Sequence, residues 1–362
     1  MNGPLRSARY SALPAPSRLV VCTPEPARRY IRRRPDRSQL VRLGFQAAFL
    51  LVNLWIGARF YLWVRFYETG GASTAVTRPP GVEGWLPIAA LMNLKYVLVT
   101  GDLPPLHAAG LFLLVAFLAI AFLLRKAFCS WLCPIGTLSE WLWQGGREIF
   151  GRTVALPRWA DLPLRSLKYS LFGLFFYAVA SMSAADLRGF LESPYGLVAD
   201  VKMLDFFRTM GRTAALVVGG LIAVSLVVKN FWCRYLCPYG AMLGLVSLAS
   251  PVRIRRDPGA CIDCAKCSAA CPALLPVDKL VAVRSAECTA CLACVAACPS
   301  AAALDLAAGR RRRVPAWAVG AAIAALFLVA VGTARLAGVW HTVLPDAVLF
   351  DLIPRAREFT HP

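Results

Sequence analysis

Two copies of one cysteine phrase constrain this chain more than any other part of its sequence. Each copy reads Cys-x2-Cys-x2-Cys-x3-Cys-Pro; the first runs from Cys261 to Pro272 and the second from Cys288 to Pro299. Eight of the 13 cysteines lie in these two phrases. Cysteines spaced this closely are typical of metal sites or of disulfide frameworks, so the surrounding fold has to bring their sulfur atoms together.

The repeated phrase favours a pair of iron-sulfur clusters over zinc sites or disulfides. Zinc sites take four ligands in two pairs, whereas here one four-cysteine unit is written twice and proline closes each copy. The spacing is typical of bacterial ferredoxin segments with two 4Fe-4S clusters, in which the fourth cysteine of each run binds the other cluster. The predicted ligands of cluster 1 are Cys261, Cys264, Cys267 and Cys298, and those of cluster 2 are Cys288, Cys291, Cys294 and Cys271.

The remainder of the chain has the composition of a membrane protein. Hydrophobic residues make up 58% of the 362 residues, well above the usual share in soluble proteins. The apolar stretch 86–100 is interrupted by Asn93 and Lys95, so we expect an interfacial or re-entrant helix there. Transmembrane helices are predicted at about 40–64, 108–128, 166–185, 213–228 and 314–336.

These patterns predict a mainly α membrane protein with about five transmembrane helices and an inserted α+β ferredoxin domain of the bacterial two-cluster type. Short strands at 252–254 and 303–306 should pair and close that domain. Cys22 is expected to be a free thiol. The expected order is a disordered basic cytoplasmic leader (1–39), a four-helix membrane domain (40–250), the ferredoxin domain (251–309), and a fifth helix with a short outer tail (310–362).

The net charge of +20 does not require a nucleic-acid partner. Nearly all of the excess positive charge lies on segments that the predicted topology places in the cytoplasm, which is the bias of multi-pass membrane proteins. No basic groove with stacking aromatic side chains is needed to explain it. This bias puts the N-terminus and the ferredoxin domain in the cytoplasm and the C-terminus in the periplasm. The cysteines then lie on the reducing side, which suits metal ligands better than disulfides.

A second repeated phrase follows two of the predicted helices at their inner ends. It reads Cys129-Ser-Trp-Leu-Cys133-Pro-Ile-Gly and later Cys233-Arg-Tyr-Leu-Cys237-Pro-Tyr-Gly. A residue before proline avoids the α conformation, whereas proline suits the first turn of a helix, so each helix should break at its second cysteine. A helix N-terminus there would favour thiolate. The four cysteines could meet at one metal or iron-sulfur centre, cycle as two dithiol pairs, or pack as small buried residues.

Other polar residues give weaker indications. The chain has three histidines, too few for us to expect a haem between membrane helices. His107 and His341 should lie near the outer surface, either solvated or sharing a haem, a metal or a quinol proton site. Gln46 and Asn53, inside the first helix, should form hydrogen bonds between helices or line a quinone site.

The two Cys-x3-Cys-Pro phrases, followed by a two-cluster segment, resemble the membrane polyferredoxin family that includes the NapH, NosR and CcoG proteins. The likeness covers about residues 40–309. It implies a bacterial inner-membrane protein in contact with lipid, with cytoplasmic 4Fe-4S clusters. It further implies electron traffic between the quinone pool, or a cytoplasmic donor, and a periplasmic or membrane redox partner.

Two main functions are compatible with the sequence. The first is an iron-sulfur electron-transfer subunit of a larger oxidoreductase system, without catalytic residues of its own. The second is metal handling, in which reactive thiols bind or reduce copper for the assembly of a respiratory enzyme. The six methionines form no cluster, which disfavours copper. A cluster-based redox sensor is a third option.

Overall fold

The computed structural model describes residues 37–104, 106–309 and 312–361. Most of the predicted leader, with Cys22, lies outside the described residues. The helices are α1 (Ser38–Glu68), η1 (Pro80–Trp85), α2 (Pro87–Thr100), α3 (Ala108–Leu124), α4 (Phe128–Trp131), α5 (Pro134–Phe150), α6 (Arg158–Ser181), α7 (Ala184–Glu192), α8 (Pro194–Leu197), α9 (Ala199–Arg208), α10 (Arg212–Val227), η2 (Trp232–Leu236), α11 (Pro238–Ser247), α12 (Lys266–Ala270), η3 (Val277–Lys279), α13 (Ala293–Ala296), α14 (Ala316–Leu336) and α15 (Asp346–Leu352).

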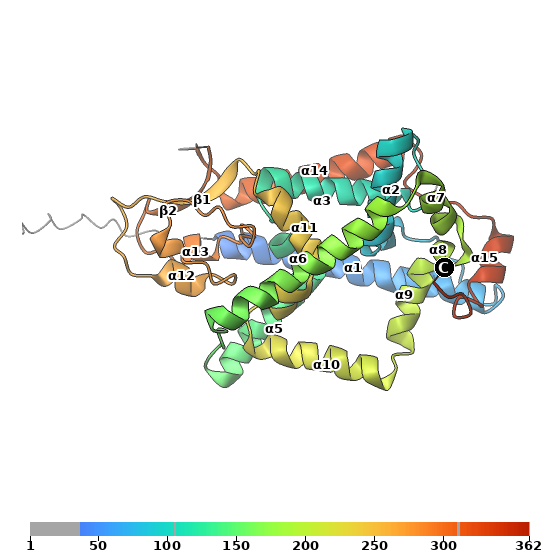
Figure 1. Cartoon of the computed structure of the whole chain (residues 1–362), viewed down its shortest axis with the longest axis horizontal. Helices are drawn as coiled ribbons and strands as arrows, with labels where there is room; N and C mark the ends of the chain where they lie inside the picture. Colours follow the sequence, from blue (N-terminus) through green and yellow to red (C-terminus); the bar gives the residue numbers. More distant parts are fainter. Residues whose placement is uncertain (1–36, 105, 310–311, 362) are drawn as a thin grey trace, which may run out of the picture.

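The molecule is elongated, and its cysteine-rich part lies at one end (Figure 1). Helices α12 and α13 lie at that end, whereas α7, α8, α9 and α15 lie at the opposite end. The long helices α1, α3, α6 and α14 run between the two ends. One cluster of buried apolar side chains extends from α3 and α14 into the cysteine-rich part, so the two regions share a core.

Two helices, α1 and α14, are each long and apolar enough to cross a membrane. The α6–α7 pair is bent by 104° and the α9–α10 pair by 82°, and each pair passes the same test only when taken as one broken span. The described residues therefore contain two candidate spans, or up to four, where the sequence predicts five. The predicted helix 108–128 is shorter in the structure, because Arg125 adopts a left-handed φ of 63° and ends α3.

Two regions that connect predicted transmembrane helices contain further helices. Gly145 and Gly146 lie inside α5, where a Cβ atom at position 146 would lie 1.8 Å from the Leu226 carbonyl oxygen. Glycine there permits a close approach of α5 to α10. The predicted outer loop 186–211 contains α7, α8 and α9, and a capping box at Ser183 begins the first of them.

A small antiparallel sheet closes the cysteine-rich part. Strands β1 (Val252–Arg256) and β2 (Leu304–Ala308) pair with Ile254 opposite Leu306, which confirms the predicted pairing of the two ends of this domain. Both of these apolar side chains are buried. A third strand, β3 (Arg312–Arg313), pairs with β2 and was not predicted.

Candidate functional site

The two Cys-x3-Cys-Pro phrases fold alike. The first cysteine of each phrase lies on a short helical turn, α4 or η2, and the second cysteine is the N-cap of the helix that follows, α5 or α11. The Cys133 sulfur accepts a hydrogen bond from the Gly136 N–H, and the Cys237 sulfur accepts one from the Gly240 N–H, with N–S distances of 3.5 and 3.3 Å. The predicted start of a new helix at the proline after each second cysteine is confirmed, but α3 and α10 already end at Leu124 and Val227, before the first cysteine of each phrase.

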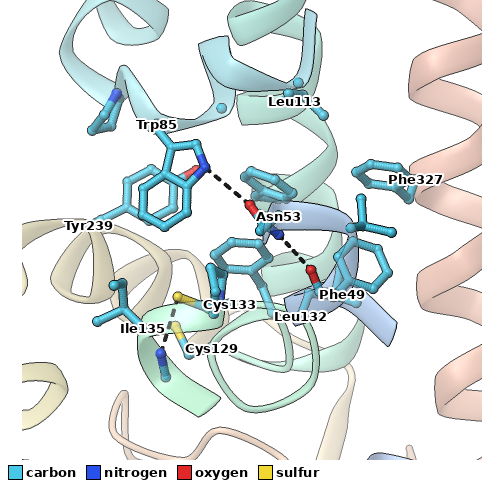
Figure 2. Close-up of a pocket in the computed structure, with 18 of the residues that line it drawn as sticks. Phe49, Asn53, Trp85, Leu113, Cys129, Leu132, Cys133, Ile135, Tyr239 and Phe327 are labelled. Carbon is cyan, nitrogen blue, oxygen red and sulfur yellow. Dashed lines mark hydrogen bonds between the residues drawn. The ribbon is translucent and has the colours of Figure 1, made fainter. Parts of the chain in front are cut away.

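Helix packing between the repeats brings the four cysteines together. Helix α11 of the second repeat packs on α3 of the first, and α5 of the first packs on α10 of the second. All four cysteines line one cavity and lie close enough to affect one another's charge. Figure 2 shows Cys129 and Cys133 side by side on the cavity wall. This arrangement favours a shared thiol centre over inert packing.

Burial controls the charge state of these thiols. Loss of water raises the pKa of Cys133 to about 11, although the Gly136 N–H opposes the shift, and it also raises the pKa of Cys237. The preference for thiolate expected from the helix N-terminus is therefore outweighed. Both side chains remain partly accessible because they face the cavity. Within the described ranges, no three Cys, His, Asp or Glu side chains are arranged around a single metal ion.

Gly136→Ala is expected to disturb the first cysteine pair, whereas Gly240→Ala should be tolerated. A Cβ atom at position 136 would lie 2.1 Å from the Cys129 carbonyl oxygen, but at position 240 the nearest atom would be 3.7 Å away. The backbone around Cys129 must move to relieve this clash, at a cost of about 1–3 kcal/mol. Thermal unfolding of the two purified variants checks this; equal melting temperatures would contradict it.

A buried ion cluster joins the thiol region to the loop that precedes Cys288. Glu287 accepts hydrogen bonds from the Lys168 ammonium at 2.6 Å and the Tyr169 hydroxyl at 2.8 Å, and the Lys126 ammonium lies 3.5 Å from its carboxylate. Burial would raise the pKa of Glu287, but Lys126 and Lys168 outweigh it and hold that pKa at about 2. This cluster was not predicted from the sequence. The available signal was the carboxylate of Glu287, directly before the second cysteine phrase.

Further hydrogen bonds fix the same loop against α1 and α4. In each of them a side chain of α1 or α4 donates to a backbone carbonyl oxygen of the loop, so the loop is held by its main chain. The donors and acceptors are Ser130 Oγ to Thr289 O at 2.7 Å, Trp131 Nε1 to Ala290 O at 3.2 Å, and Gln39 Nε2 to Cys291 O at 3.0 Å.

The two polar residues predicted inside α1 both bond to other elements. Gln46 donates to the Ser130 carbonyl oxygen and to the Glu140 carboxylate, each at 3.0 Å, and does not line the cavity. Asn53 lines the cavity, where its Oδ1 accepts from Trp85 Nε1 at 3.1 Å (Figure 2). The predicted interhelical hydrogen bond is confirmed at both positions, and Asn53 also meets the cavity.

The ferredoxin-type cysteines divide into an open and an enclosed group. The open group lines one small cavity of its own, and Cys264 is exposed. All four side chains of the enclosed group are buried, and Cys291 of this group also lines the large cavity. The open group is Cys261, Cys264, Cys267 and Cys298, and the enclosed group is Cys271, Cys288, Cys291 and Cys294.

The two cysteine loops share an unusual backbone. The residues before and after the second cysteine of each run have a left-handed backbone. They are Asp263 and Ala265 in the first run and Ala290 and Leu292 in the second. A left-handed residue other than glycine costs roughly 1–2 kcal/mol. The same two positions bear this cost in each loop, which indicates that each loop is shaped to turn its cysteines toward one bound group.

His107 and His341 line a second cavity, of about 450 Å³, which reaches α8 and α15 at the end opposite the cysteine-rich part. His341 is exposed, as a solvated side chain would be, but His107 is only 2% exposed. Its Nδ1 lies 3.8 Å from Glu83 Oε1, and Glu83 pairs with Arg78 at 2.7 Å. The expectation of a solvated side chain is therefore wrong for His107, which forms part of a buried charged network.

The cysteine loops and apolar helices together define a class, the iron-sulfur electron-transport proteins. The family model described as "4Fe-4S dicluster domain" matches residues 253–299. The model described as "4Fe-4S binding domain" matches residues 106–153 and 211–256, and each of these stretches contains one Cys-x3-Cys-Pro phrase. The chain belongs to the membrane polyferredoxin family, as the sequence resemblance indicated.

Similar proteins carry electron-transport names. The chain is 49% identical over 326 residues to the "Putative electron transport protein YccM" of Escherichia coli K12, covering 88% of this chain and 91% of that protein. It is 28% identical to "Protein NirI" of Paracoccus denitrificans, over 71% of this chain and 34% of that protein. It is 26% identical to "Ferredoxin-type protein NapH" of Escherichia coli K12, over 50% of this chain and 59% of that protein. No solved structure matches significantly.

Proposed function

We propose that this protein carries single electrons between the quinone pool of a membrane and a redox partner protein that docks at its cysteine-rich end. One observation carries the proposal: Cys291, a predicted iron ligand, lines the same cavity as the four Cys-x3-Cys-Pro cysteines. The thiol centre and one iron-sulfur site would therefore face a common space inside the helices.

The open and enclosed groups are the ligand sets that we assign to cluster 1 and cluster 2. The repeated spacing and the matched left-handed residues support this assignment, as does the small cavity that the open group lines. When bound, each cluster supplies a one-electron couple. The exposure of Cys264 supports contact between the open group and a protein partner, and the burial of Cys291 supports a membrane-facing enclosed group.

The cysteine-rich end would lie in the cytoplasm of a bacterium and the C-terminus in the periplasm. The excess of positive charge on the first side supports this orientation. A reporter enzyme that works only outside the cytoplasm should be active when it is fused after Pro362. An inactive fusion would indicate the opposite orientation.

Electron transfer is favoured over copper reduction by the two-cluster cysteine segment and by the name of a relative that is 49% identical, a putative electron transport protein. A copper-reducing function would instead be supported if the purified protein took up copper in proportion to the Cys-x3-Cys-Pro thiols.

Anaerobically purified protein is expected to contain about eight iron atoms and as many sulfides per chain, the content of two 4Fe-4S clusters. Elemental analysis and electron paramagnetic resonance of the reduced protein measure this content. About twelve iron atoms would place a third cluster at the Cys-x3-Cys-Pro thiols, and an iron-free, colourless protein would contradict the proposal.

A further inference from the structure

The large cavity has the size and the walls of a site for an apolar cofactor. Its volume is about 730 Å³, within the usual range of pockets that enclose organic ligands. Phe49, Leu113 and Phe327 form part of its wall, and they come from α1, α3 and α14 (Figure 2). Most of the exposed cavity wall is apolar, but charged side chains also line it, among them Lys126, Arg234 and Glu287, and so do the four thiols.

The two repeats present different side chains to this cavity at one equivalent position. The third residue after each Cys-x3 spacer is Ile135 in the first phrase and Tyr239 in the second, and both line the cavity. Figure 2 shows Ile135 beside Cys129 and Cys133, and the Tyr239 ring beside Trp85. The repeat is therefore asymmetric at this position: the second phrase supplies a phenol where the first has an aliphatic side chain.

Aromatic neighbours hold the Tyr239 ring in place. It packs edge to face against Phe117 and Phe128, with ring centroids 6.4 and 6.0 Å apart. A phenol hydroxyl is protonated at neutral pH and can donate a hydrogen bond. Tyr239 therefore supplies a donor on the cavity wall.

A neutral ring with carbonyl acceptors fits the mostly apolar walls of this cavity. A haem needs axial ligands, and His341 is the one histidine that lines this cavity within the described part of the chain. A quinone ring needs apolar walls and a donor for its carbonyl oxygen, and the cavity supplies both.

We propose that the ring of an isoprenoid quinone binds in this cavity with one carbonyl oxygen accepting a hydrogen bond from the Tyr239 hydroxyl. The inference rests on the proposed electron-transfer function and adds to it the residue that holds the quinone ring. Tyr239 positions the ring beside the four thiols and Cys291.

Tyr239→Phe removes the donor and keeps the ring, so binding of decylubiquinone should weaken about tenfold. Ile135→Trp fills the same region from the opposite repeat and should abolish binding. Quenching of tryptophan fluorescence measures the affinity of the detergent-solubilised full chain, and radiolabelled decylubiquinone replaces it for the tryptophan variant. Tyr177→Phe is the matched control, because Tyr177 is 71% exposed on α6. This variant should bind decylubiquinone as the wild type does.

Unchanged affinity in both cavity variants would overturn the inference, as would a wild-type protein that releases phospholipid on extraction and binds no decylubiquinone. The proposed function would fail differently. In that case the iron and sulfide content, or the reduction of the clusters by dithionite, would be missing even in wild-type protein, whatever the quinone result.

Discussion

Cys291→Ser is expected to abolish reduction of the protein by quinol, whereas Cys264→Ser should leave that reduction intact. Both changes remove one predicted iron ligand, and each should lower the iron content from about eight to about four atoms per chain. The difference lies in position: Cys291 is buried and lines the large cavity, while Cys264 is exposed at the far side of the cysteine-rich part. Loss of the cluster at the enclosed group should therefore stop electron transfer from the membrane side to the partner side.

Electron paramagnetic resonance after addition of decylubiquinol, and separately after dithionite, measures the two effects. Dithionite should reduce the open cluster that remains in the Cys291 variant, because it reaches that site from solvent. Cys22→Ser is the control, since Cys22 belongs to neither repeated phrase. Equal quinol-driven reduction in the Cys291 and Cys264 variants would contradict the assigned order of the two sites.

Glu287→Gln is expected to destabilise the protein by about 3–5 kcal/mol, because it leaves two buried lysines without their carboxylate. Lys168 is 0% exposed and Lys126 is 3% exposed, and Glu287 is the acidic partner of both. Chemical unfolding of the holoprotein, followed by loss of the iron-sulfur absorbance, measures the change.

A second substitution separates lost pairing from simple damage to the loop. Adding Lys168→Met to Glu287→Gln removes one of the stranded cations, so the double variant should lose less stability than the two single losses added together. Glu148→Gln changes an exposed carboxylate in α5 and should have little effect. Strict additivity of the two single losses would show that the ion cluster contributes nothing as a unit.

Short-range patterns made much of the fold predictable. Proline after Cys133 and Cys237 predicted where new helices start, because proline restricts the residue before it and suits a first helical turn. The repeated cysteine spacing predicted the two-cluster segment, and the ends of that segment pair as expected. These features depend on neighbours in sequence.

Features that depend on distant neighbours were missed or misplaced. Lys168 lies near the start of a predicted transmembrane helix, and the sequence did not predict its partner: it is buried because Glu287, far along the chain, pairs with it. His107 was expected to be solvated, but Glu83 and the surrounding helices enclose it. Hydropathy also did not predict the sharp bends between α6 and α7 and between α9 and α10. The number of membrane spans therefore cannot be obtained from composition alone.

The crossed packing of the repeats makes the four-thiol arrangement a property of the whole chain. Because α5 packs on α10 and α3 packs on α11, each cysteine pair is held by helices from both repeats. Neither repeat on its own contains all the contacts that bring the four thiols together.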